Sequence, residues 1–180
     1  MFTLTEDLAK EFLSESGLPV PKGAAFAESG DAGAFSDGLT GGAVVKALIP
    51  TGRRGKAGAV QLVGDSAAVT KAADAMLGTE VHGFDVEKVY VEAKIDIAKE
   101  FYLSFSLEGF PGQILLSSKG GVDIEETHKN DPEAVIRADI CPIDGVTESL
   151  AQDLWRQAGL EGDELATTVV TTVALYQAFV

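Results

Sequence analysis

Two short apolar segments, joined by a cationic and glycine-rich loop, constrain the fold of this chain more than any other stretch. The segments are residues 43–49 and 59–63, and the loop between them reads Pro-Thr-Gly-Arg-Arg-Gly-Lys-Ala-Gly. Short apolar runs bounded by Gly and Pro are typical of strands. We therefore expect a strand–loop–strand unit, in which the glycines let the loop backbone turn sharply and approach a ligand closely.

The charge of this loop is opposite to that of the chain as a whole. The sequence holds 28 acidic and 14 basic residues, a formal net charge of -14, yet it has no carboxylate between Asp37 and Asp65. Four of the 14 cations lie in the eleven residues from Lys46 to Lys56. Lys46 is inside an apolar strand, where a Lys is rarely buried without a partner. We interpret the loop as a phosphate-binding loop, and a solvated hairpin tip is the alternative.

Neither common nucleotide-binding motif describes this loop. The Walker pattern needs four residues between its glycines, a Ser or Thr after the Lys, and a following helix whose backbone N–H groups face the phosphates. Here two residues separate Gly52 from Gly55, Ala57 follows Lys56, and the next segment is strand-like. The G-x-G-x-x-G pattern of dinucleotide-binding folds is also absent. The loop is therefore expected to be a strand–loop–strand nucleotide clamp.

Composition limits the remaining classes of protein. A length of 180 residues suits one sizeable domain or two small lobes. The single cysteine, Cys141, excludes an internal disulfide and a cysteine-based metal site. No apolar run approaches the ~18 residues of a membrane span, so we expect a cytoplasmic protein with no membrane partner. The acidic charge, and the lack of aromatic residues between Phe35 and Phe84, argue against nucleic acid as a partner.

Hydrophobic periodicity predicts the other elements. Helices are expected between the capping box at 3–6 and Gly17, and over residues 65–77, 147–157 and 163–180. Alternating apolar residues predict strands over residues 88–94, 97–107, 113–117 and 135–140. Residues 28–42 hold five glycines and are expected to form a loop or a poorly ordered helix. Together the elements indicate an α+β fold, with largely antiparallel sheet and flanking helices.

Four motifs in a fixed order resemble one known family. Val44-Val45-Lys46, the loop 52–58, Val91-Glu92-Ala93 and residues 96–102 follow one another as in the ATP-grasp domain of the succinyl-CoA synthetase β subunit and related acid–CoA ligases. Residues 120–125, Gly-Gly-Val-Asp-Ile-Glu, are similar to the G-G-V-E-I-E segment of that family, and residues 160–162 match a further turn. The resemblance covers nearly the whole chain. It implies two ATP-grasp lobes, one made of residues 1–20 and 101–180, and a smaller one of residues 21–100.

The resemblance also implies roles for individual residues. Lys46 and the turn Arg53-Arg54-Gly55 would hold the phosphates of ATP or GTP. Glu92 and the backbone near Ile95 would lie at the adenine and the hinge, and Glu100 would contact the ribose or neighbouring polar groups. A compact Lys charge and a bidentate Arg suit phosphate binding. The alternative for Glu92 and Glu100 is that both are ordinary exposed strand residues.

The implied reaction is the formation of an acyl-CoA from a carboxylic acid, CoA and a nucleotide, through a phosphohistidine on a partner α subunit. Neither His82 nor His128 has the glycine-rich or cation-rich surroundings of a phosphoacceptor. The family resemblance favours succinate as the acid. Arg53 replaces a glycine of the family pattern and resembles the R-R-G-K of ATP-citrate lyases, so malate and citrate are variants. The alternative function is a non-catalytic module that binds nucleotide or a partner subunit.

The family continues beyond the equivalent of Val180 into an E-I-N-P segment and a later Asp that supply Mg²⁺ ligands. Neither is present in this sequence. We therefore expect the chain to correspond to the front of a longer subunit, with the Mg²⁺ ligands outside it and with little activity of its own.

Overall fold

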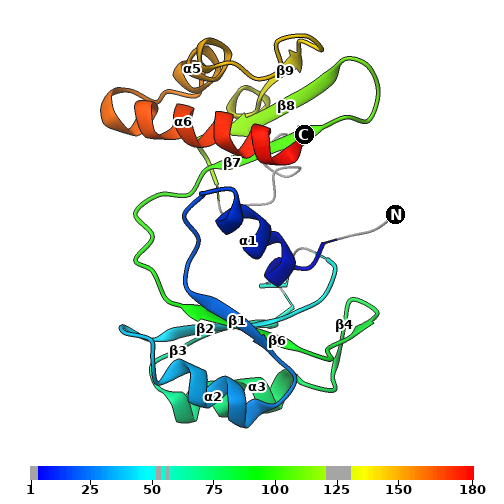
Figure 1. Cartoon of the computed structure of the whole chain (residues 1–180), viewed down its shortest axis with the longest axis vertical. Helices are drawn as coiled ribbons and strands as arrows, with labels where there is room; N and C mark the ends of the chain where they lie inside the picture. Colours follow the sequence, from blue (N-terminus) through cyan, green and yellow to red (C-terminus); the bar gives the residue numbers. More distant parts are fainter. Residues whose placement is uncertain (1–3, 52–53, 56, 121–130) are drawn as a thin grey trace. The chain divides into compact units, whose positions relative to one another are not determined.

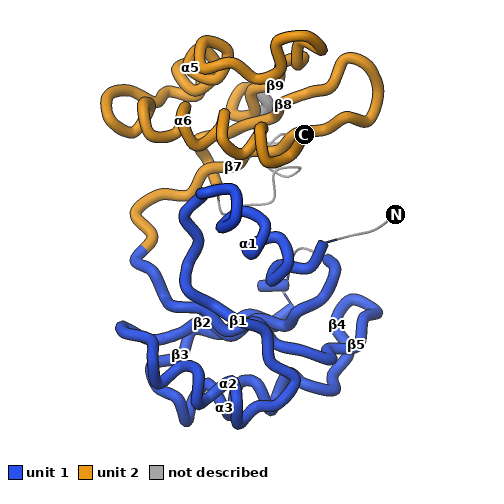
Figure 2. Tube along the Cα trace, viewed as in Figure 1, with its two compact units in different colours: residues 1–96 blue, residues 97–180 orange. Residues whose placement is uncertain are grey.

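The computed structural model describes residues 4–51, 54–55, 57–120 and 131–180. The chain divides into two compact units, Met1–Asp96 and Ile97–Val180 (Figure 2). Both units combine antiparallel sheet with helices (Figure 1), which confirms the predicted α+β class. Among the described helices, none has the length and apolar character required to span a membrane.

The first unit is built on a four-stranded antiparallel sheet. Its strand order is β1 (Gly23–Phe26), β6 (Val89–Ala93), β2 (Ala43–Ala47), β3 (Val60–Val63). Strands β2 and β3 pair directly, with Ala43 opposite Val63. The predicted strand–loop–strand unit is therefore confirmed, and its loop lies at one end of a central strand.

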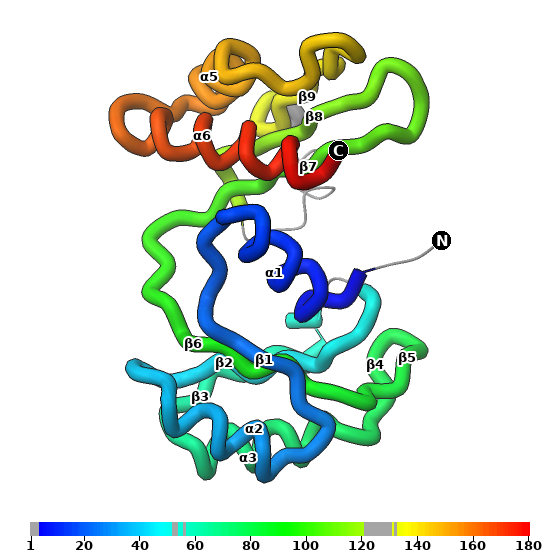
Figure 3. The backbone as a smooth tube through the Cα atoms, in the orientation of Figure 1, coloured from blue at the N-terminus to red at the C-terminus, as the bar shows by residue number. Residues whose placement is uncertain are grey.

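Two helices, α2 (Ser29–Ser36) and α3 (Ser66–Met76), lie side by side on one face of this sheet (Figure 3). Helix α3 forms as expected: the Asp65 carboxylate caps it by accepting from Ala68 N at 2.7 Å, and Gly78, at φ 72°, follows its end. Its buried residues are the four that the helical period predicts, Val69, Ala72, Ala73 and Met76. They form an apolar core with Val45, Val89 and Val91 of the sheet.

Helix α2 forms where we expected a loop or a poorly ordered helix. One of the glycines that motivated that expectation, Gly33, has a packing role. A Cβ on Gly33 would collide with Oγ1 of Thr70 in α3, so the absent side chain is what lets the two helices approach closely. Helix propensity counts a glycine as a cost of about 1 kcal/mol, but tertiary contact outweighs it here.

The rest of the first unit is a short hairpin and the N-terminal helix. Strands β4 (Glu80–Val81) and β5 (Phe84–Asp85) form the hairpin, which the sequence did not predict. Helix α1 (Glu6–Glu15) ends before Gly17, at φ 79°, as predicted. It lies on the sheet face opposite α2 and α3 (Figure 3) and buries none of its residues.

The second unit has a three-stranded antiparallel sheet of β7 (Tyr102–Ser106), β8 (Gly112–Ser117) and β9 (Ile136–Ile140). A 3₁₀ turn, η1 (Pro132–Ala134), precedes β9, and helices α5 (Glu148–Gln157) and α6 (Gly162–Phe179) pack on the sheet. Trp155 lies in the centre of the core, where its indole N–H donates to Thr172 Oγ1 at 2.8 Å. The predictions for β8, β9, α5 and α6 are confirmed.

Two predicted boundaries differ from the structure. The strand expected over residues 97–107 begins only at Tyr102, and Ile97 is exposed in the preceding segment. Helix α1 clusters with residues up to Asp96, whereas we grouped residues 1–20 with residues 101–180. Helix α1 contacts β1 and forms ion pairs with the sheet of the first unit. That the functional lobes follow the predicted ranges stays a prediction.

Candidate functional site

The alternation of strands β2 and β6 sends apolar and polar side chains to opposite faces of the first sheet. Val45 and Val91 join the core under α2 and α3, whereas Lys46, Tyr90 and Glu92 point to the other face. In the register of the two strands, Lys46 is opposite Tyr90, and Glu92 is opposite Val44. Lys46 and Glu92 are therefore diagonal neighbours on one face of the sheet, close enough for long side chains to meet.

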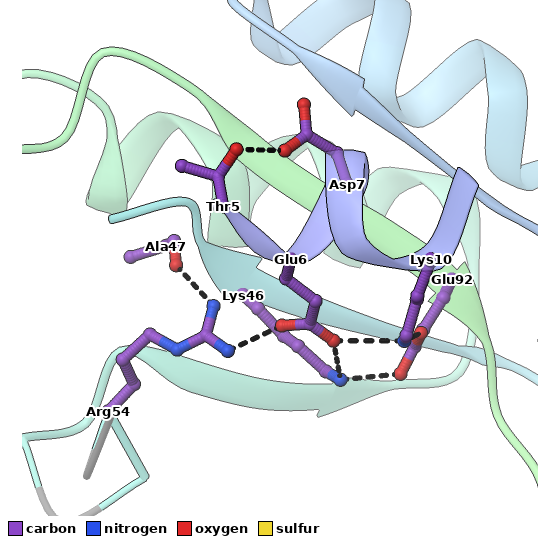
Figure 4. A network of polar contacts seen from close by, with 8 residues as sticks. All are labelled: Thr5, Glu6, Asp7, Lys10, Lys46, Ala47, Arg54 and Glu92. Atoms are coloured by element: carbon purple, nitrogen blue, oxygen red, sulfur yellow. Dashed lines mark hydrogen bonds and ion pairs between the residues drawn. The ribbon is translucent and has the colours of Figure 1, made fainter. Parts of the chain in front are cut away.

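Helix α1 adds two charged residues to this face. Glu6 and Lys10 are one helical turn apart, so both project from the same side of the helix toward the sheet (Figure 4). Lys46 Nζ lies 2.7 Å from Glu6 Oε1 and 2.6 Å from Glu92 Oε1. Lys10 Nζ lies 2.9 Å from Glu6 Oε1 and also pairs with Glu92. The expectation that Lys46 has a charged partner is confirmed, and its partners are carboxylates of the chain.

The loop between β2 and β3 contributes a third cation. One terminal nitrogen of Arg54 donates to the carbonyl oxygen of Ala47 at 2.9 Å, and the other donates to Glu6 Oε2 at 2.5 Å (Figure 4). The amide of Ala59 closes the loop by donating to the carbonyl oxygen of Arg54 at 3.0 Å. We call the group Glu6, Lys10, Lys46, Arg54 and Glu92 the polar cluster.

The polar cluster is largely shielded from water. The side chains of its three cations are each 18% exposed, that of Glu6 is 15% exposed and that of Glu92 is 8% exposed. Burial alone would raise the pKa of Glu6, but the hydrogen bonds and charges of Lys46 and Lys10 outweigh it and lower the pKa to about 2. Burial alone would lower the pKa of Lys10. The hydrogen bonds and charges of the Glu92 and Glu6 carboxylates outweigh burial and raise this pKa. Three cations against two carboxylates leave this part of the sheet with a positive charge.

The predicted site residues are only partly brought together. Lys46, Arg54 and Glu92 meet in the polar cluster, with Gly55 next to Arg54 in the loop, while Arg53 lies outside the described residues. The reading of Glu92 as an ordinary exposed strand residue is wrong, because it is buried and paired with two cations.

The two remaining predicted residues lie on exposed chain between the last strand of the first sheet and β7. Ile95 is 57% exposed and follows β6 within two residues. Glu100 belongs to the second unit and is exposed, but it precedes β7 and so is not a strand residue. The carbonyl oxygen of Glu100 accepts from Gly120 N at 2.9 Å, and a Cβ on Gly120 would collide with the backbone of Glu100.

Sequence reasoning missed Glu6 and Lys10. A Glu four residues before a Lys on a helix is a recognisable pair, but it is as common on solvated helices as in sites. The stronger signal was the need of Lys46 for an anionic partner, which the sequence could not assign to Glu6, 40 residues away.

A cavity of about 580 Å³ adjoins the polar cluster. It is bounded by helix α1, by residues 20–25, which lead into strand β1, and by Tyr90. Lys10 belongs to both the cavity wall and the cluster, and its ammonium lies 5.0 Å from the centre of the Tyr90 ring. The arrangement places the three converging cations next to a space of the size that small ligands occupy. Lys10 lies on the wall of this cavity, and the α1 side of the wall also carries the carboxylates of Asp7, Glu11 and Glu15.

Comparison with known proteins identifies the family of the chain. Residues 3–180 match the model of the ATP-grasp domain. The β subunit of GDP-forming succinate–CoA ligase from Thermus thermophilus is 37% identical over 178 residues, which are 98% of this chain and 47% of that subunit. The β subunit 2 of ADP-forming succinate–CoA ligase from Streptomyces coelicolor is also 37% identical, over 98% of this chain and 46% of its own length. The chain thus spans about half the length of these relatives.

A solved structure shows the same fold. Acetyl-coenzyme A synthetase 1 of Ca. Korarchaeum cryptofilum, solved with coenzyme A and Ca-AMPCP, superposes with a TM-score of 0.76 at 19% identity, covering 97% of this chain and 79% of that one. The match to the family model covers nearly every residue, and the antiparallel sheets with flanking helices agree with it. The chain therefore belongs to the ATP-grasp domain family.

Proposed function

We propose that this chain is the nucleotide-binding part of an acid–CoA ligase subunit similar to the β subunit of succinate–CoA ligase. The observation that carries the proposal is the convergence of Lys10, Lys46 and Arg54, from a helix, a strand and a glycine-rich loop, on one sheet face. These cations stand out in a chain of net charge -14. Lys46 and the turn Arg53-Arg54-Gly55 would hold the phosphates of ATP or GTP.

The geometry of Lys46 and Arg54 suits phosphate binding. Lys46 projects from β2, an inner strand of the sheet, so its ammonium is a point charge on a rigid support. The two terminal nitrogens of Arg54 are both donors, and one of them is already anchored on a backbone carbonyl. Neutralising and positioning phosphate groups are the dominant contributions of a protein to phosphoryl transfer. The chain would contribute these, without a covalent nucleophile of its own.

The other predicted contacts take more specific roles. Since the Glu92 carboxylate pairs with Lys10 and Lys46, we propose that it holds these cations in place beside the adenine and hinge region. The backbone near Ile95 lies at the boundary between the two units, where a hinge would be placed. Glu100 is proposed to meet the ribose, with its backbone fixed by Gly120. The cavity beside Lys10 has room for the nucleoside.

The described residues of the polar cluster do not suit Mg²⁺. Glu6 and Glu92 are the only carboxylates in it, and each is already paired with at least two cations. A magnesium ion prefers carboxylate and water oxygens that are free to coordinate it. Its protein ligands are therefore proposed to lie outside the polar cluster.

The names of the relatives support the wider reaction. Two of them are β subunits of succinate–CoA ligases, which favours a ligase subunit over a non-catalytic module. We propose that the whole protein joins succinate, or malate or citrate, to CoA at the expense of ATP or GTP. A phosphohistidine on a partner α subunit would carry the phosphoryl group. A cytoplasmic location is proposed with this assignment.

Thermal shift with ATP tests the assignment of the phosphate site. Lys46→Ala and Arg54→Ala should each abolish the stabilisation by ATP while leaving a cooperative melting transition, because a ligand stabilises only the state that binds it. Lys71→Ala is the matched control, since this Lys is exposed on α3, on the other side of the sheet. If both cluster variants keep the wild-type response to ATP, the phosphate site is elsewhere.

A further inference from the structure

We infer that the Glu6 carboxylate occupies the place of a nucleotide phosphate on Lys46 and Arg54, so that nucleotide binding displaces it. The inference rests on the proposed function and adds a competing group to the phosphate site. Glu6 uses one oxygen for Lys10 and Lys46 and the other for Arg54. A planar anion that joins an ammonium and a guanidinium through separate oxygens has the contacts that a phosphate group makes with the same two side chains.

The charge of the polar cluster supports displacement. With Glu6 seated, three cations face two carboxylates, and the cluster has one net positive charge. With Glu6 withdrawn, the same cations face only Glu92, and two positive charges remain for the phosphates. A triphosphate placed beside a seated Glu6 would meet a like charge in a shielded site, which is unfavourable.

The two carboxylates differ in how they are attached to the fold. Glu92 projects from β6, which has β1 on one side and β2 on the other, so its backbone is fixed by two strand pairings. Glu6 is in the first turn of α1, a helix that buries none of its residues. A small shift of α1 can therefore withdraw Glu6 from the cluster, whereas the backbone of Glu92 cannot shift without breaking strand pairings.

The electrostatics of the polar cluster favour an anion at the position of the Glu6 carboxylate. The Glu6 carboxylate stays charged despite its burial, because Lys46 and Lys10 lower its pKa to about 2. The cations would hold any anion of suitable size there in the same way. Glu6 thereby keeps Lys46 and Arg54 paired and desolvated until the nucleotide arrives, and its removal should strengthen nucleotide binding.

Calorimetric titration with inorganic triphosphate tests this directly. Glu6→Gln keeps the size and hydrogen-bonding capacity of the side chain but removes its charge, and we expect the dissociation constant to fall about tenfold relative to wild type, the effect of one charged contact. Glu28→Gln is the control, because it removes the same charge from an exposed residue outside the cluster. Its dissociation constant should change by less than about twofold, as expected for a screened surface charge.

The outcomes distinguish a wrong assignment of the phosphate site from a wrong inference about the displacement of Glu6. If wild type binds no triphosphate, or if Lys46→Ala binds it as well as wild type, the phosphate site itself is misassigned. If binding depends on Lys46 and Glu6→Gln weakens it or leaves it unchanged, the phosphate site stands and the inference is wrong. Glu6 would then orient the cations instead of competing with the ligand.

A measurement on the wild-type protein covers the case in which Glu6→Gln does not fold. Saturating triphosphate should speed hydrogen exchange of the backbone amides in residues 9–13 of α1, because the helix loses its contacts to Lys46 and Arg54. Unchanged or slower exchange in this segment would contradict displacement.

Discussion

Helix α1 of the first unit and helix α5 of the second unit are held by different forces. In the second unit, α5 buries Ala151, Leu154 and Trp155 against the sheet, and apolar contact fixes the helix. In the first unit, α2 and α3 do the same on one face, but α1 on the other face buries nothing and is connected to the sheet through Glu6 and Lys10. Apolar packing gives a rigid support, while ion pairs can be exchanged for those of a ligand. The proposed nucleotide-binding face is the one held by charges.

The largest effect should come from the apolar core of the second unit. Trp155→Ala removes a side chain that is 1% exposed and leaves Thr172 without its indole partner. We expect the free energy of unfolding to fall by about 3–5 kcal/mol, as for other large-to-small changes in a core. Urea denaturation followed by circular dichroism measures this loss. A change below about 1 kcal/mol would mean that the two units do not differ in packing as described.

The second largest effect should come from acid, which weakens the polar cluster. The pKa of Glu6 is about 2 in the folded protein and 4.5 as its ordinary value, so the unfolded state binds the proton first as pH falls. The stabilisation by Glu6 is therefore complete above about pH 4.5 and is lost between about pH 4.5 and 2. From the size of the shift, the loss is at most about 3 kcal/mol.

Comparing wild type with Glu6→Gln isolates this effect from the other carboxylates of the chain. The difference in unfolding free energy between the two proteins should shrink as pH falls through that window, because protonated Glu6 and Gln are both neutral. Urea denaturation at a series of pH values measures it. Parallel pH profiles would show that Glu6 is not held by the cations in solution.

Hydrophobic periodicity was enough to predict the elements in which the periodic apolar residues are also the buried ones. The helical period of α3 identified all four of its buried residues, and the alternation in β6 placed Glu92 on the face opposite Val91. For the region of α2 we expected a loop or a poorly ordered helix because its glycines lower helix propensity, and Thr70 of α3 explains one of them, Gly33. The benefit of a close helix–helix approach depends on a residue that is far away in sequence.

The polar cluster shows that local sequence pattern also cannot identify all the residues of a site. The sequence indicated that Lys46 needs an anionic partner, but a carboxylate of the chain and a phosphate of a ligand meet that need equally well. Lys10 and Glu92 pair across 82 residues of sequence, which no periodicity encodes. The sequence therefore identified Lys46, Arg54 and Glu92, and the structure was required to find Glu6 and Lys10, which pair with them.

The smallest effect should come from the apolar side chains of α1. Phe12 is 47% exposed on this helix, so Phe12→Ala should change the free energy of unfolding by no more than about 0.5 kcal/mol. Leu154→Ala, on the packed helix α5, provides the contrast and should cost about 2–5 kcal/mol. Urea denaturation of both variants gives the comparison. A cost above about 2 kcal/mol for Phe12→Ala would mean that apolar packing holds α1, and a helix held in that way could not release Glu6 by a small shift.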